Sequence, residues 1–151
     1  MRPSAIVGWL LAAPPVRRTR AAWALTAIRV GSAAVFISFG AGKFLNHASE
    51  TASFRTYGLP WPGAFAGVIG VVELVGGALL LAGVATRLAA VVLAGDMIGA
   101  IITSGILHGE SISLTLAPVM LGAMVVLAAL GSGPLALAAS VTKLLQSPPD
   151  R

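Results

Sequence analysis

The chain has 151 residues, of which 57% are hydrophobic and only 10% are charged. A soluble domain of this length carries about a quarter charged residues, so this composition excludes a water-exposed globule and predicts a membrane protein. The net charge of +5 does not indicate nucleic-acid binding, because the basic residues form no dense patch and aromatic residues are few. The chain contains no cysteine, which excludes disulfides, thiolate catalysis and cysteine-held metal clusters.

Four apolar stretches are long enough to cross a membrane. A spanning helix needs about 20 mostly apolar residues, since the hydrocarbon core is about 30 Å thick. The stretches are residues 21–45, 64–85, 88–107 and 112–130. The links on either side of the third stretch are very short, so consecutive helices are expected to run in opposite directions. The predicted fold is an all-α integral membrane protein, an antiparallel four-helix transmembrane bundle.

The other segments are not expected to span. Residues 46–63 are polar at first and then rich in aromatic residues and proline. Because aromatic side chains favour the headgroup level, the segment fits either a short interfacial helix over 48–57 or a plain loop. Residues 1–20 are predicted to form a cytoplasmic N-terminal segment at the interface, before a membrane domain over 21–131. Residues 132–151 are predicted to form a cytoplasmic amphipathic tail. Its apolar stripe would contain Leu135, Ala138, Val141 and Leu145.

Basic residues predict the orientation of the bundle. With four spans, both termini lie on the same side of the membrane. The basic residues on that side are Arg2, Arg17, Arg18, Arg20, Arg87, Lys143 and Arg151. The other side holds only Arg55 and, at the end of the first span, Lys43. Because cytoplasmic loops carry the excess of Lys and Arg, we expect both termini in the cytoplasm.

Three ionisable residues lie well inside the predicted spans: Arg29, Glu73 and Asp96. A lipid-facing charge at the bilayer centre costs at least about 2.5–3.5 kcal/mol, so such residues normally turn inward and find partners. Counting along each span places both acids near the midplane, with Arg29 about 6 Å nearer the cytoplasm. Two carboxylates beside one cation cannot both stay ionised, which predicts an Arg29–Glu73 ion pair and a protonated Asp96. We expect Lys43 to extend outward to the interface.

Small residues at three- and four-residue spacing let helices approach closely in lipid. The pattern occurs in three of the predicted spans. Its members are Ala34, Ser38 and Gly42 in the first span, Ala66, Gly70, Glu73 and Gly77 in the second, and Gly95, Asp96, Gly99 and Thr103 in the third. The stripes therefore predict that the ionisable residues point to the bundle interior.

Two interpretations of these charges remain open. In the structural one, an ion pair fixes the register of the helices. In the functional one, the charges line a cavity that binds or protonates a polar group, such as the head of a quinone. No nucleophile, base dyad or phosphate loop accompanies them, so no catalytic residue is assigned. His47 and His108 fall outside the spans without a second shell of ligands, so no metal site is predicted.

A set of motifs carries a family resemblance. The first span contains Arg29-Val-Gly31 and Phe39-Gly40-Ala-Gly42-Lys43-Phe44. There follow Tyr57-Gly58-Leu59-Pro60, Val72-Glu73-Leu74-Val75-Gly76-Gly77, Leu81-Ala-Gly83-Val84-Ala85-Thr86-Arg87 and Asp96-Met97. Together, over about residues 25–130, these motifs resemble the DoxX family of small four-helix bacterial membrane proteins. The resemblance implies a bacterial plasma (inner) membrane location and places the family's polar set on Arg29, Lys43, Glu73 and Arg87.

Some proteins of this kind are linked with quinone-coupled sulfur oxidation, or with a membrane oxidoreductase assembly containing superoxide dismutase and a sulfurtransferase; wider relatives resemble cargo receptors or assembly factors. We therefore expect an accessory subunit of a quinone-linked redox system, without catalytic activity of its own. The candidate residues for binding a quinone or lipid are Arg29, Lys43, Glu73 and Asp96. The alternative is a membrane scaffold, assembly or lipid- or cargo-binding protein with no redox role. Expected partners are membrane lipids and other proteins of a membrane complex, or further copies of the chain.

Overall fold

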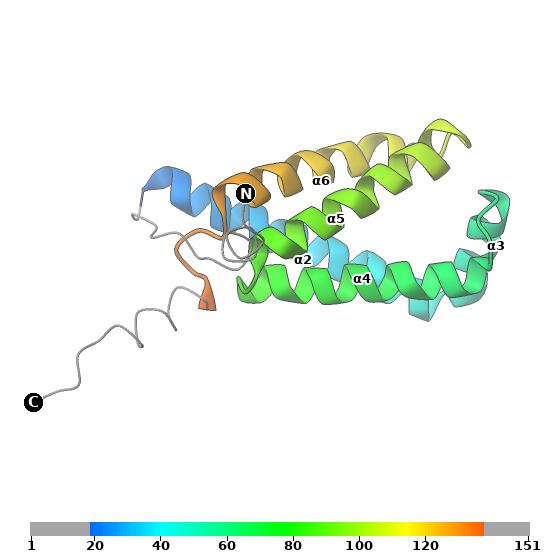
Figure 1. The fold of residues 1–151 in the computed structure, drawn as a ribbon, viewed down its shortest axis with the longest axis horizontal. Helices are drawn as coiled ribbons and strands as arrows, with labels where there is room; N and C mark the ends of the chain where they lie inside the picture. Colours follow the sequence, from blue (N-terminus) through cyan, green and yellow to red (C-terminus); the bar gives the residue numbers. More distant parts are fainter. Residues whose placement is uncertain (1–18, 138–151) are drawn as a thin grey trace, which may run out of the picture.

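The computed structural model describes residues 19–137, and this part of the chain is helical without strands. Its four candidate spans are α2 (Arg20–Leu45), α4 (Pro62–Ala82), α5 (Thr86–Ala100) continued by the π-helical η1 (Ile101–Ile106), and α6 (Ser111–Leu130). All four are long and apolar enough to cross a membrane. The predicted fold of four membrane-spanning helices is therefore confirmed (Figure 1).

The first connection contains a further helix, α3 (His47–Thr56). Of the two alternatives for this segment, the helix is therefore the right one. α3 packs against α4 and stands at the end of the bundle where α2 ends and α4 begins (Figure 1). Because α3 follows α2 after the single residue Asn46, the last turn of α2 is joined directly to a second helix.

Residues at the helix ends explain where the spans begin and stop. The hydroxyl of Thr19 accepts a hydrogen bond from the backbone N–H of Ala22 and caps the start of α2. Gly83 ends α4 with a φ of 69°, a left-handed conformation that glycine adopts without strain. The Glu110 carboxylate accepts hydrogen bonds from the N–H groups of Ile112 and Ser113. Glu110 thereby caps α6, where the positive end of the helix dipole favours an acid.

The bundle consists of two closely packed helix pairs, α2 with α4 and α5 with α6. The pairs diverge toward the end that carries α3 (Figure 1). Fully buried apolar side chains, including Leu80, Met124 and Leu127, fill the opposite half of the bundle. The molecule is therefore tightly packed at one end and open at the other.

Glycines bring α2 and α4 together. A Cβ on Gly40 would lie 2.9 Å from the carbonyl oxygen of Gly70, and a Cβ on Gly77 would lie 3.2 Å from that of Ala33. Such distances leave no room for a side chain, so the two backbones touch here. The buried positions of Gly70 and Gly77 confirm the small-residue stripe predicted for the second span.

The stripe predicted for the first span is wrong. Ala34 and Ser38 are exposed on the outer face of α2, and a Cβ on Gly42 would meet no atom within 4 Å. The contact uses Ala33 and Gly40 instead. Because glycine, alanine and serine occur on several faces of this helix, spacing alone does not reveal which face meets α4.

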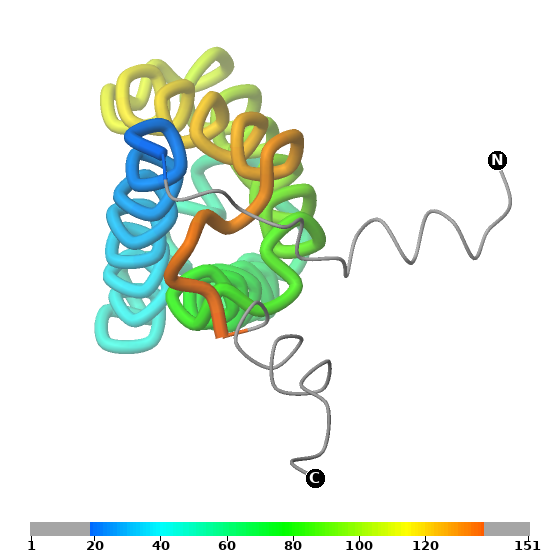
Figure 2. Tube along the Cα trace, turned by 90° about the vertical axis from the view of Figure 1, so that its left-hand side faces the viewer, coloured from blue at the N-terminus to red at the C-terminus, as the bar shows by residue number. Residues whose placement is uncertain are grey.

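The residues after α6 cross the end of the bundle opposite α3 (Figure 2). Gly131, Ser132, Gly133 and Ala136 are buried there. A Cβ on Gly133 would lie 2.5 Å from the hydroxyl of Thr26, so this segment fits closely against α2. The predicted amphipathic stripe, apart from Leu135, lies outside the described residues, as do residues 1–18 of the predicted N-terminal segment.

Candidate functional site

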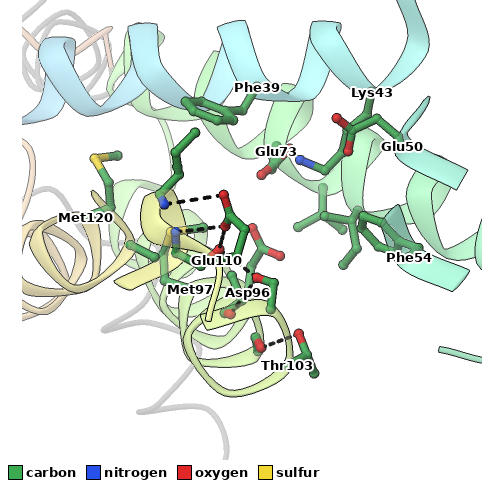
Figure 3. A pocket seen from close by; sticks show the side chains of 18 of the residues that line it. Phe39, Lys43, Glu50, Phe54, Glu73, Asp96, Met97, Thr103, Glu110 and Met120 are labelled. Carbon is green, nitrogen blue, oxygen red and sulfur yellow. Dashed lines mark hydrogen bonds and ion pairs between the residues drawn. The ribbon is translucent and has the colours of Figure 1, made fainter. Parts of the chain in front are cut away.

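A cavity of about 610 Å³ lies between the two helix pairs, in the half of the bundle where they diverge. All four spans and α3 contribute to its walls, which are mostly apolar. The apolar residues include Phe39, Phe54, Phe65, Val72, Val92 and Met120. The ionisable side chains on the lining, apart from Tyr57 at the rim, are Lys43, Glu50, Glu73, Asp96 and Glu110 (Figure 3).

Lys43 and Glu73 form an ion pair across the α2–α4 contact, with Nζ 2.7 Å from Oε2. Both residues are more than nine-tenths buried. The ammonium also lies 5.9 Å from the centre of the Phe39 ring, within the range of a cation–π interaction. The predicted extension of Lys43 to the interface is therefore wrong. Its Cβ lies against Gly70, so the last turn of α2 directs this side chain into the bundle.

Arg29 lies at the other end of α2, and its predicted ion pair with Glu73 is wrong. Its Nε donates to the carbonyl of Ser132 at 2.9 Å and its Nη2 to that of Leu135 at 2.8 Å. Its Nη1 donates to the carbonyls of the last turn of α4, those of Leu80 and Leu81. The buried guanidinium thus joins the end of α4 to the segment that crosses the bundle.

Helix register explains the exchange of partners. Arg29 and Lys43 are about 21 Å apart along the axis of α2, at 1.5 Å per residue. The Gly40–Gly70 contact places Glu73 level with the last turns of α2, so only Lys43 can reach it. Depths in the membrane that are counted within each span separately do not take into account this offset between α2 and α4.

Asp96 lines the facing wall of the cavity, from α5. Its Oδ2 is buried and accepts no hydrogen bond from any side chain or backbone group in the described part of the chain. On the same wall, a Cβ on Gly95 or Gly99 would meet no atom within 4 Å. The small residues of the third span therefore face the interior, as expected, but they leave open space instead of bringing two helices together.

A chain of hydroxyl groups continues from this wall toward the turn before α6. Ser104 of η1 lies 2.6 Å from Ser113, Oγ to Oγ. The Ser113 hydroxyl in turn donates to the carboxylate of Glu110. The π-helical turn widens the backbone at this point, a feature common near functional sites. The polar lining of the cavity is therefore continuous from η1 to the start of α6.

Two aromatic rings meet at the end of the cavity that carries α3. Tyr57, which follows α3, and His108, in the turn before α6, have ring centres 5.2 Å apart. Burial raises the pKa of Tyr57, and the nearby carboxylates of Glu110 and Glu50 raise it further. The pair links the α2–α4 side of the bundle to the α5–α6 side at the rim of the cavity.

The two histidines, His47 and His108, lie on different segments. His108 Nδ1 is 2.7 Å from the carbonyl oxygen of Thr103, which orients its ring. Among residues 19–137, no group of three or more His, Cys, Asp or Glu side chains is arranged to hold a metal ion.

Of the four candidate residues, the structure brings Lys43, Glu73 and Asp96 to one cavity and separates Arg29 from them. Arg87, which the family resemblance adds, donates to the carbonyl of Ala129 at the closed end. Sequence reasoning missed two lining acids, Glu50 and Glu110, because they lie in the polar segments between spans. Acids are enriched near the starts of helices, so the position of Glu110 before the fourth apolar stretch is a weak signal for the start of a helix and none for the cavity.

Comparison with known proteins gives a family and two relatives. The family model described as DoxX matches residues 24–106, more than half of the chain. Over 76 residues, 50% of this chain, the sequence is 43% identical to "Uncharacterized membrane protein Rv3486" of Mycobacterium tuberculosis, with 47% of that protein covered. It is 40% identical over 76 residues, again 50% of the chain, to "Putative oxidoreductase CatD" of Bacillus subtilis, with 55% of that protein covered. The chain thus spans about half the length of the curated relatives it matches. No solved structure matches it.

Proposed function

This chain belongs to the DoxX family, and we propose that it is an accessory subunit of a membrane redox system that binds a quinone between its helix pairs. The observation that carries the proposal is an apolar cavity of about 610 Å³ with a few polar groups on its walls, among them Lys43, Glu73 and Asp96. Small-molecule sites have this range of volume, apolar walls and a few polar groups that orient the ligand.

The lining residues fit a quinone head and its apolar substituents. Phe39 and Phe54 offer flat apolar faces on which a ring packs. Asp96 Oδ2, buried and without a hydrogen-bond donor among the described residues, is available to a hydroxyl group. Lys43 has three ammonium protons and directs its Nζ at one carboxylate, so it can also donate to a carbonyl oxygen. A bound quinone supplies two-electron redox chemistry, while these side chains bind and orient it.

A redox role requires a carrier of electrons. The chain has no cysteine, so the carrier is a bound small molecule or a partner protein. The Bacillus subtilis relative has the word oxidoreductase in its name, which supports a redox setting. We therefore assign the catalytic step to a partner in a membrane complex and the binding of the quinone to this subunit.

The proposed location is the plasma membrane of a bacterium, with both termini in the cytoplasm. In the described structure, Arg20, Arg29 and Arg87 lie toward the closed end of the bundle, whereas Lys43 and Arg55 lie toward the α3 end. More of these basic residues thus lie toward the closed end, and because cytoplasmic sides carry the excess of Lys and Arg, the closed end is assigned to the cytoplasm. The cavity would then lie in the half of the bundle that faces away from the cytoplasm.

Organic extraction of the purified protein tests the proposal against a scaffold, assembly or lipid- or cargo-binding role. We expect full-length protein purified in a mild detergent to release quinone in an amount comparable to that of the protein. An unrelated four-helix membrane protein, purified from the same cells in the same way, gives the background. Quinone at this background level, with phospholipid as the sole extracted molecule, would contradict the proposal and support the alternative.

A further inference from the structure

Acids outnumber bases among the ionisable side chains of the cavity. Four carboxyl side chains line it, those of Glu50, Glu73, Asp96 and Glu110, against the single cation of Lys43. Within residues 19–137, no arginine, histidine or second lysine lines the cavity. Carboxylates accept hydrogen bonds and do not donate them, and even a protonated carboxyl group retains an acceptor oxygen. The lining is therefore rich in acceptors.

Donors on the same walls already have partners within the protein. The ammonium of Lys43 is directed at Glu73, 2.7 Å away. The hydroxyl of Thr103 donates to the carbonyl of Gly99 at 2.8 Å. Apart from the hydroxyls of Ser53 and Tyr57, at the end of the cavity that carries α3, few donors therefore remain for a ligand that brings only acceptors.

The serine hydroxyls are engaged in the same manner. Ser113 donates to the carboxylate of Glu110, and Ser104 lies within hydrogen-bond distance of both Ser113 and the carbonyl of Ala100. Each of these hydroxyls has one proton, which these contacts use. Asp96 Oδ2, in contrast, is a buried acceptor on the cavity wall without a hydrogen-bond partner among the described residues. Such an acceptor costs free energy until a ligand supplies a donor.

We propose that this cavity selects ligands whose apolar body carries a hydrogen-bond-donating hydroxyl head, and that it binds a hydroquinone more tightly than the corresponding quinone. This inference rests on the proposed function and names the redox form that the site prefers. The hydroxyls of a hydroquinone can donate to Asp96 and its neighbouring carboxylates. The carbonyls of a quinone can only accept, so they would have a donor in Lys43 but would face another acceptor at Asp96.

The preference has a consequence for electron transfer. Tighter binding of the reduced form raises the midpoint potential of the bound couple, by about 30 mV for each tenfold ratio of dissociation constants in a two-electron couple. A site of this kind would keep its bound ligand in the reduced, hydroquinone form until a partner protein oxidises that ligand.

Binding of a matched redox pair tests the inference. Full-length protein in detergent would be titrated anaerobically with decylubiquinol and with decylubiquinone, by calorimetry. We expect decylubiquinol to bind at least about tenfold more tightly, the effect of one hydrogen bond to a charged group. Asp96→Asn replaces one acceptor oxygen with a donor and should reduce this ratio several-fold. Ser38→Ala, which removes an exposed hydroxyl on the outer face of α2, is the matched control and should keep it.

The outcomes separate this inference from the proposed function. Equal or tighter binding of decylubiquinone would overturn the selection of donors while leaving quinone binding intact. An unchanged ratio in Asp96→Asn would overturn the assignment to Asp96. Failure of both forms to bind would contradict both proposals. Tighter binding of dodecylamine than of decylubiquinol would show that the acids select an ammonium group, which would overturn the hydroxyl assignment.

Discussion

Lys43 and Glu73 are buried partners, with Nζ 2.7 Å from Oε2, at a point where α2 and α4 touch. Arg29, on the same helix, instead donates hydrogen bonds to four backbone carbonyls at the closed end. The two buried cations of α2 thus have separate roles. One stabilises the closed end of the bundle, and the other forms part of the cavity wall.

Breaking the ion pair should destabilise the protein. Lys43→Met leaves Glu73 buried without a cation, and removing one partner of a buried pair costs about 3–5 kcal/mol. The double variant Lys43→Met, Glu73→Met should recover most of this loss, since apolar residues of similar volume replace both charges. The free energy of unfolding in detergent micelles measures both effects. If Lys43→Met alone were as stable as the wild type, the ion pair would contribute nothing to the free energy of unfolding.

The fork of the Arg29 guanidinium should be needed to hold the segment after α6. Arg29→Lys keeps the charge, but an ammonium cannot reach the carbonyls of Leu80, Ser132 and Leu135 together. The chain has no cysteine, so introduced cysteines report accessibility without background. Position 136 is only 2% exposed, so we expect Ala136→Cys to resist maleimide in the wild-type background. In the Arg29→Lys background the same cysteine should react rapidly with maleimide.

Leu137→Cys, at a position 59% exposed, is the matched control and should react in both backgrounds. Equal protection of Ala136→Cys with and without the guanidinium would show that other contacts hold the segment.

Gly40 should tolerate no side chain, in contrast to Gly42 on the same helix. A leucine at position 40 would meet the backbone of Gly70 and the side chain of Leu74 at 2.9 Å, and overpacking of this kind costs about 1–3 kcal/mol. In Gly42→Leu the new Cβ would meet no atom within 4 Å, and the helix gains propensity, so the stability should be unchanged or higher. Thermal unfolding of both variants in detergent compares them, and equal midpoints would contradict the close contact.

Tyr57 is the single tyrosine of the chain, so alkaline titration of its absorbance reports on it alone. Burial, then the carboxylates of Glu110 and Glu50, raise its pKa above the ordinary value of 10.0. Because the folded state holds this proton more tightly, its contribution to stability is present below pH 10 and is lost as the pH rises through the folded-state pKa. We expect a midpoint above 10.0 that moves down in Glu110→Gln. A midpoint at or below 10.0 in the wild type would contradict the site's acidic surroundings.

Hydropathy predicted the four spans to within a few residues, because bilayer thickness limits the length of an apolar helix wherever it packs. The first stretch, 21–45, corresponds to α2 (Arg20–Leu45), and the fourth, 112–130, to α6 (Ser111–Leu130). The inward direction of Glu73 and Asp96 was also predictable, since an ionisable group facing lipid is costly.

Partners were not predictable in the same way. Which cation meets Glu73 depends on the register of two helices, and that register follows from the contact between Gly40 and Gly70. The role of Gly99 was not predictable either. A glycine that permits close packing and a glycine that leaves a cavity occur at the same spacing in a sequence. Both distinctions arise only when the helices are assembled.

Filling the cavity tests whether a quinone binds inside it. Gly99→Leu adds a side chain on the cavity wall, at a position where a Cβ would meet no atom within 4 Å. Gly122→Leu adds the same side chain on the exposed face of α6, outside the cavity, where a Cβ likewise meets no atom. In calorimetric titrations with decylubiquinone and decylubiquinol, we expect Gly99→Leu to weaken binding by at least about tenfold at unchanged stability, because the added side chain occupies volume that the ligand needs. Gly122→Leu should bind as the wild type does. Equal affinities in all three proteins would show that the ligand does not bind in this cavity.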